Sequence, residues 1–169
     1  MNTFFGSILH ILIFIFTSTY AFIFPKNGFD FIYLVISFSV ILSWTLYNGE
    51  CYITYWTKCI QDPNYVPGKN VMNNEDLYVL PFPKNMINML IDFTMVIFWV
   101  SIYYVFQRNK YPKIVPFILI ACWALYKMIL GMYEHHDTNK EFHYYQGILF
   151  YILFFDFLYF LYYKFSVIK

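Results

Sequence analysis

Five polar side chains lie within or at the ends of the long apolar runs of this sequence, and their types could carry chemistry. They are His10, Asn48, Asp92, Lys127 and Asp156. Charged groups in an apolar interior are rare, face the inside of a helical bundle and usually have partners. We therefore predict that these five residues form a buried polar cluster.

Two of these charges, Asp92 and Lys127, lie at matching depths in consecutive apolar runs. At about 1.5 Å per residue, Asp92 is roughly 8 Å inside one end of the run 87–105, and Lys127 is roughly 9 Å inside the adjacent end of the run 114–133. Two opposite charges at the same depth on neighbouring antiparallel helices can reach each other, so we predict that Asp92 and Lys127 form a buried ion pair. Asp156 lies several residues deeper in its own run, within reach of the flexible Lys127 stem.

Two interpretations of this cluster stay open. In the first, the ion pair is structural and fixes the register of the helices. In the second, the polar groups line a water-accessible cavity with Asp156 as its deepest acid, because ionisable groups with perturbed pKa values gather at functional sites. A cavity that reaches Asp156 would favour transport or catalysis, whereas a dry interior would favour the structural role.

Metal binding is not expected from this sequence. Its candidate ligands are His135, His136 and His143, which lie among acidic residues in the connector 134–146. Adjacent histidines point apart on a helix, and no His-x-x-x-His or His-Glu-x-x-His spacing occurs. The three histidines are therefore weak candidates, and no cofactor is identified.

The composition places the chain among integral membrane proteins. Hydrophobic residues make up 60% of the 169 residues and charged residues only 12%, whereas soluble domains carry about 25% charged residues. A net charge of +1 gives no general attraction to nucleic acid, so none is expected as a partner. Lipid is then the main solvent of this chain.

Five apolar runs are each close to the length of about 20 residues that crosses a bilayer. We predict an all-α bundle of five transmembrane helices in a single domain, 1–169, with a polar loop, 50–86, as a cap on one face. Prolines punctuate this loop, but 51–61 could form a short interfacial helix. The predicted spans are 4–24, 29–47, 87–105, 114–133 and 147–163.

Five spans place the two termini on opposite faces. Face A holds the amino terminus, the loop 50–86 and the connector 134–146, with four Lys or Arg residues against seven acidic ones. Face B holds the other connectors and the carboxyl terminus, with six Lys or Arg residues against one acidic residue. Because short cytoplasmic loops carry the excess of Lys and Arg, we expect face B to be cytoplasmic and face A to be extracellular or lumenal.

The cysteines do not form a disulfide scaffold, because there are only three of them. Cys51 and Cys59 lie on face A, where disulfides would persist. On a helix their rise alone would separate them by roughly 12 Å, which is beyond disulfide reach. A bridged, non-helical segment and a helix with free thiols both remain open, and the pattern favours the helix.

The segment Trp-Thr-Leu-Tyr-Asn-Gly-Glu-Cys-Tyr-Ile-Thr-Tyr-Trp, residues 44–56, follows a first span that contains His10. It resembles a group of small multipass membrane proteins in which a helical hairpin ends in a Gly-x-Cys-x-Leu-Thr-like stretch. The residue usage is similar to that of membrane proteins of giant DNA viruses. Here Tyr52 stands where the group usually has Pro, and Ile53 where it has Leu. The resemblance implies a hairpin and a defined local structure at 49–54, but no activity.

The leading functional prediction is a non-catalytic structural or interaction subunit, since no phosphate loop or nucleophile-elbow motif occurs. The first alternative is a small-molecule or proton-coupled transporter that uses Asp92, Lys127 and Asp156. The second is an intramembrane enzyme acting on a lipid or small apolar substrate, with His10 and Asp92 as acid and base. The expected partners are the bilayer, other membrane proteins or a small ligand in the outward-facing half.

Overall fold

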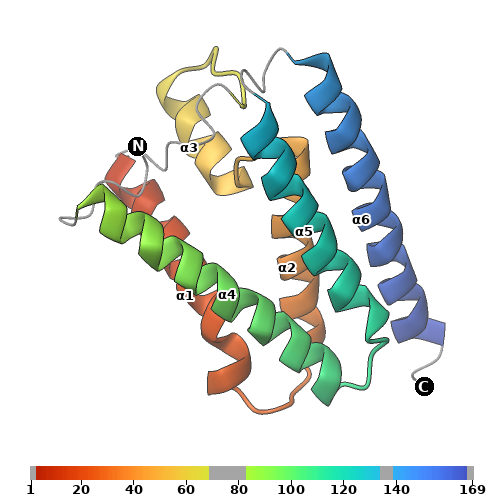
Figure 1. The fold of residues 1–169 in the computed structure, drawn as a ribbon. Helices are drawn as coiled ribbons and strands as arrows, with labels where there is room; N and C mark the ends of the chain where they lie inside the picture. The colour runs from red at the N-terminus through yellow and green to blue at the C-terminus, as the bar shows by residue number, and fades with distance from the viewer. Residues whose placement is uncertain (1–2, 69–82, 134–138, 167–169) are drawn as a thin grey trace.

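The computed structural model describes residues 3–68, 83–133 and 139–166, and it is all-helical over these ranges. Figure 1 shows the helices and the order in which the chain connects them. The elements are α1 (Thr3–Ile23), α2 (Asp30–Leu46), α3 (Tyr52–Gln61), α4 (Lys84–Arg108), α5 (Ile114–Met132) and α6 (Lys140–Ser166).

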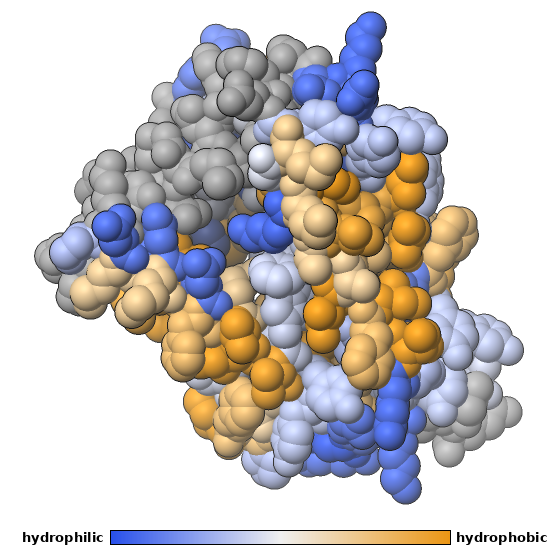
Figure 2. Space-filling model, in the orientation of Figure 1, coloured by the Kyte–Doolittle hydropathy of each residue, from blue (hydrophilic) through white to orange (hydrophobic). Residues whose placement is uncertain are grey.

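Three of these helices, α4, α5 and α6, are long and apolar enough to cross a membrane. The described parts of α1 and α2 form shorter apolar helices, Ile8–Ile23 and Asp30–Leu46. Apolar side chains gather on much of the face that Figure 2 shows, outside the grey region, and exposed ones occur on every helix. The predicted helical class is thus confirmed, whereas five membrane crossings remain a prediction.

The helices pack in an order that differs from their order along the chain. α1 packs most extensively against α4, and α6 packs against both α5 and α2. In Figure 1, α4 is inclined to α5, and the two are joined at the end of the molecule that also holds the carboxyl terminus. α3 lies toward the opposite end of the molecule, and the assignment of the connectors to faces A and B stays a prediction.

Aromatic rings fill the core near face B. Phe160 of α6 is fully buried, and its ring centroid lies 5.5 Å from that of Phe38 on α2 and 5.4 Å from that of Phe106 on α4. Tyr111, in the α4–α5 connector, meets Phe160 edge-on at 5.2 Å. Aromatic ring pairs contribute favourable interaction energy in addition to that from the apolar area they bury. This cluster therefore holds α2, α4 and α6 together.

An ion pair between Asp30 and Arg108 fixes the same end of the bundle. Arg108 Nε donates to Asp30 Oδ2 at 2.8 Å, and its Nη2 donates to Oδ1. Asn109 Nδ2, at 2.6 Å, and the Tyr20 hydroxyl, at 3.1 Å, also donate to this carboxylate. Arg108 Nη1 donates to two carbonyls at the end of α1, at 3.2 and 2.7 Å. One guanidinium therefore joins α1, α2 and α4.

The turn between α2 and α3 depends on a left-handed backbone. Asn48 and Gly49 have φ angles of 51° and 97°, which end α2 because Asn and Gly tolerate this region best. Asn48 Nδ2 donates to the Pro67 carbonyl at 2.8 Å, and a Cβ on Gly68 would lie 2.7 Å from the Asn48 Cβ. The chain after α3 thus folds back tightly against the turn.

The short helix predicted at 51–61 is confirmed as α3. Cys51 is the residue immediately before it, and Cys59 lies in its last turns. Both thiols are free, so the helical alternative without a disulfide is the one that the structure adopts.

Candidate functional site

A cavity of about 420 Å³ opens between α1, α2, α4 and α5, with the start of α3 at one end. Pockets for small ligands are commonly about 300–1,000 Å³ and mostly apolar, with a few placed polar groups. The apolar lining residues are Ile11, Ile13, Phe14, Ile15, Val40, Trp44, Ile53, Ile87, Leu90, Ile91, Met95, Trp123 and Leu130.

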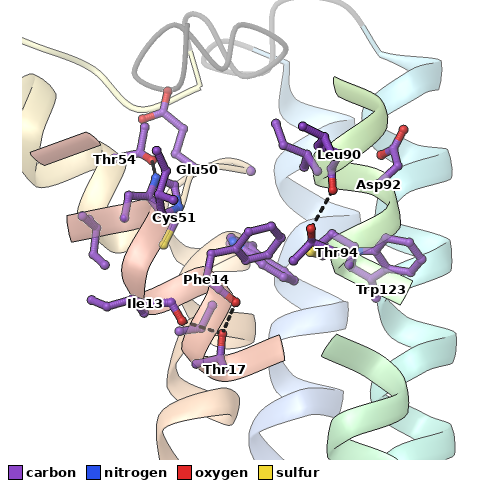
Figure 3. A pocket seen from close by; sticks show the side chains of 18 of the residues that line it. Ile13, Phe14, Thr17, Glu50, Cys51, Thr54, Leu90, Asp92, Thr94 and Trp123 are labelled. Atoms are coloured by element: carbon purple, nitrogen blue, oxygen red, sulfur yellow. Dashed lines mark hydrogen bonds between the residues drawn. The ribbon is translucent and has the colours of Figure 1, made fainter. Parts of the chain in front are cut away.

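The polar groups of the cavity lie on separate walls. Glu50, Cys51 and Thr54 come from the α2–α3 turn and α3, and Figure 3 shows them grouped on one wall. Asp92 and Thr94 lie on α4 across from them. Further polar or charged lining residues are His10, Thr17, Lys58, Tyr126 and Lys127. The cavity is therefore apolar along its length and polar near α3.

Cys51, His10 and Thr54 form a connected group in this polar part. His10, on α1, lines the cavity together with Cys51, and its Nδ1 lies 3.3 Å from Thr54 Oγ1. Cys51 has extended backbone angles, φ −69° and ψ 144°, just before α3 begins. Residues three apart at a helix start lie on one face, so the first turn of α3 presents both Cys51 and Thr54 to His10.

The surroundings of Cys51 favour its thiolate. Burial raises the pKa of the thiol, but His10 and the backbone N–H groups of Ile53 and Thr54 lower it, and the net pKa lies below its ordinary value. The N–H groups at a helix start carry partial positive charge. Cysteines at helix starts next to histidine are the reactive ones, because the thiolate is the nucleophile.

A second polar group holds the turn that positions Cys51. Lys58 Nζ lies 3.1 Å from Glu50 Oε1 and 3.1 Å from the Tyr65 hydroxyl. The Tyr65 hydroxyl also donates to Glu50 Oε1. Glu50 is buried and precedes Cys51 directly. This ion pair ties α3 and the segment after it to the residue before the thiol.

The structure brings three of the five predicted site residues to the same cavity: His10, Asp92 and Lys127. It does not form the predicted ion pair between Asp92 and Lys127, which are both exposed and unpaired with each other. The reason is the inclination of α4, which packs against α1 and diverges from α5 toward the α3 end. Equal depth along two helices did not bring their side chains into contact.

The other two predicted site residues lie elsewhere. Asn48 accepts a hydrogen bond at its Oδ1 from Gln146 Nε2 at 2.9 Å, so it joins the α2–α3 turn to α6. Asp156 is buried on α6, and neither carboxylate oxygen has a hydrogen-bond partner within the described part of the chain. The cavity does not extend to Asp156.

Only one of the three histidine candidates for metal binding lies in the part of the chain that the structure describes. His135 and His136 lie outside the described residues. His143 Nδ1 lies 3.2 Å from Gln146 Oε1. Among residues 3–68, 83–133 and 139–166, no group of three or more His, Cys, Asp or Glu side chains is arranged to hold a metal ion.

The pairing of Cys51 with His10 is the feature that sequence reasoning missed, since 41 positions separate the two residues. The signal that could have found it is the position of Cys51 at the start of a predicted helix on the face that also holds His10. No protein-family model matches the sequence, and comparisons with curated proteins and with solved structures found no match. The fold and the site together describe an α-helical protein with membrane-length helices and an apolar cavity that carries a cysteine–histidine pair.

Proposed function

We propose that this chain is a multi-pass integral membrane protein whose cavity binds a lipid-like amphiphile. The observation that carries the proposal is the cavity of about 420 Å³, which is mainly apolar and has its cysteine–histidine group beside α3. An amphiphile is likewise divided into an apolar part, its chain, and a polar part, its head group. A ligand of this kind can satisfy both parts of the cavity at once.

We further propose that α1 and α2 cross the bilayer together with α4, α5 and α6. The alternation of helix ends and the excess of Lys and Arg on face B support an amino terminus outside and a carboxyl terminus in the cytoplasm. The Asp30–Arg108 pair is compatible with this arrangement, because it neutralises charge at the face B end of the bundle. The cavity then opens in the outward-facing half of the membrane.

The charges around the cavity suggest how a head group is held. Lys58 is already paired with Glu50, whereas Lys127 is exposed and lines the cavity from α5. A cation that is not neutralised by a neighbour attracts an anionic group most strongly in a site of low dielectric constant. We therefore propose that Lys127 faces the head group and that the chain lies along α1 and α4.

The other functions considered from the sequence have less support. A structural or interaction subunit does not require a ligand-sized cavity. A proton-coupled carrier would use Asp156, but this residue lies outside the cavity. An intramembrane enzyme acting on a lipid is compatible with the amphiphile proposal and extends it.

A photoreactive fatty acid that carries a diazirine and an alkyne tests the proposal. The full chain in lipid nanodiscs is irradiated with the probe, and labelled peptides are mapped. Ile91→Trp fills the cavity from α4, and Val96→Trp is the matched control, because Val96 is exposed on α4 and does not line the cavity. We expect about tenfold weaker binding only in the first variant, which corresponds to about 1.4 kcal/mol. Equal labelling of both variants would contradict the proposal.

A further inference from the structure

Cys51 has features that binding alone does not require. Cys51 lines the cavity together with His10, whose Nδ1 lies 3.3 Å from Thr54 Oγ1 in the first turn of α3, and Cys51 directly precedes that turn. The other two cysteines lack these features: Cys59 and Cys122 are absent from the lining of this cavity. A thiol, a base and a third group that orients the base are the components of covalent catalysis by cysteine.

We propose that Cys51 is a nucleophile that accepts an acyl chain from an ester or thioester of a fatty acid, and that the protein is an acyl-transferring or acyl-hydrolysing enzyme. The inference rests on the proposed function, because the acyl chain is the part of the amphiphile that the cavity holds. A chain lying along α1 and α4 brings its carbonyl carbon to the polar part of the cavity, where the thiol is.

The first half of the reaction acylates the enzyme. His10 takes the proton of the Cys51 thiol, and the sulfur attacks the carbonyl carbon, so that a carbon–sulfur bond forms. The tetrahedral intermediate collapses when the bond from carbon to the leaving oxygen or sulfur breaks. His10 returns its proton to that leaving group, and the products are an acylated Cys51 and a free alcohol or thiol.

The second half regenerates the thiol. Water, or the hydroxyl of an acceptor, loses its proton to His10 and attacks the thioester carbon. The carbon–sulfur bond breaks, the sulfur takes the proton back from His10, and a fatty acid or a new ester leaves. No oxidant, reductant or metal ion is required by this sequence of steps.

Two other features of the site fit this chemistry. Thr54 Oγ1, at 3.3 Å from His10 Nδ1, orients the imidazole and acts as a positioning residue. The backbone N–H groups of Ile53 and Thr54 belong to the first turn of α3, which directly follows Cys51, and a developing oxyanion at this place needs such donors. Donors fixed in advance at such a position are among the largest contributions to catalysis of acyl transfer.

The test measures covalent acylation of the full chain in nanodiscs. One arm supplies an alkyne-tagged phosphatidylcholine as an ester donor, and the other an alkyne-tagged palmitoyl-coenzyme A as a thioester donor. We expect at least one donor to leave a label that hydroxylamine removes and that maps to Cys51. Labelling by one arm alone identifies the type of donor.

Matched variants separate the chemical role from a structural one. Cys51→Ala should abolish the label, whereas Cys59→Ala should keep it. His10→Gln should slow acylation about 100-fold at neutral pH, and the rate should recover at high pH, where the thiolate forms without a base. Thr54→Val should slow acylation, and Thr54→Ser should restore it. Each variant should elute from a size-exclusion column as a single species, which checks that the fold is retained. Cys51→Ser serves the same purpose, because it keeps the size of the side chain.

The outcomes distinguish this inference from the proposed function. Cross-linking of the photoreactive fatty acid without acylation by either donor would overturn the inference and leave the binding function in place. A label that persists in Cys51→Ala would also overturn it. Failure of both the cross-linking and the acylation would overturn the two proposals together.

Discussion

Removal of the Arg108 guanidinium should be one of the most destabilising single changes near face B. The side chains of Arg108 and Asp30 are only 10% and 2% exposed. In Arg108→Met the buried Asp30 carboxylate keeps, among the described residues, hydrogen bonds only from Asn109 and Tyr20, and the carbonyls of Ala21 and Phe24 lose the donor that Arg108 supplies. Breaking a buried pair by removing one partner costs about 3–5 kcal/mol, and we expect a loss in this range.

The measurement is equilibrium unfolding of the full chain in mixed micelles, followed by circular dichroism. Lys26→Met is the matched control, because Lys26 is exposed in the connector at the same end, and changes at such surface positions stay within about 0.5 kcal/mol. The double variant Asp30→Asn, Arg108→Met should be more stable than the sum of the single changes predicts, by about 1–3 kcal/mol.

The reasoning would be refuted by a loss below about 1 kcal/mol in Arg108→Met, which is the range of an exposed ion pair. Strict additivity in the double variant would refute it as well. Either result would mean that water reaches this pair at the end of the bundle.

Three further predictions concern the α3 end. A double-mutant cycle with Asp92→Asn and Lys127→Met should show coupling below about 0.5 kcal/mol in the free energy of unfolding, because the two side chains do not pair. Alkylation of Cys51 by iodoacetamide should persist below the ordinary thiol pKa of about 8.5, because the lowered pKa keeps thiolate present as the pH falls. In His10→Ala the pH midpoint of the alkylation rate should rise. Gly68→Ala should lower the free energy of unfolding by about 1–3 kcal/mol in the same assay. The reason is that Gly68 has φ 95° and a Cβ there would lie 2.7 Å from the Asn48 side chain. Unchanged stability would contradict the turn geometry.

The helices themselves were largely predictable from the sequence. The runs 87–105 and 114–133 correspond to α4 and α5, and α3 coincides with the predicted short helix 51–61. Long apolar runs bounded by Pro, Gly and Asn carry this information locally. α6 begins earlier than expected, at Lys140, because its polar first turns continue the helix beyond the apolar run. The resemblance of residues 44–56 to a group of multipass proteins stays a prediction.

The side-chain partners were much less predictable. The sequence suggested Asp92 with Lys127, but the structure pairs Asp30 with Arg108, 78 positions apart. The connectivity places both ions of that pair on the same face, but nothing in the sequence pairs them with each other. Their contact depends on α1 and α2 both lying against α4, and no local pattern records which helices become neighbours.

By itself, the sequence determined that this chain is helical and apolar, because backbone hydrogen bonds satisfied within helices and an excess of apolar residues leave few other choices. It also determined which residues have the chemistry to react. Which of them meet depends on the tertiary structure, because α4 is inclined to α5, Asp92 and Lys127 form no ion pair with each other, and the turn before α3 places Cys51 in the same cavity as His10. Contacts between distant segments are set by how whole helices pack, and that packing is a property of all their side chains together.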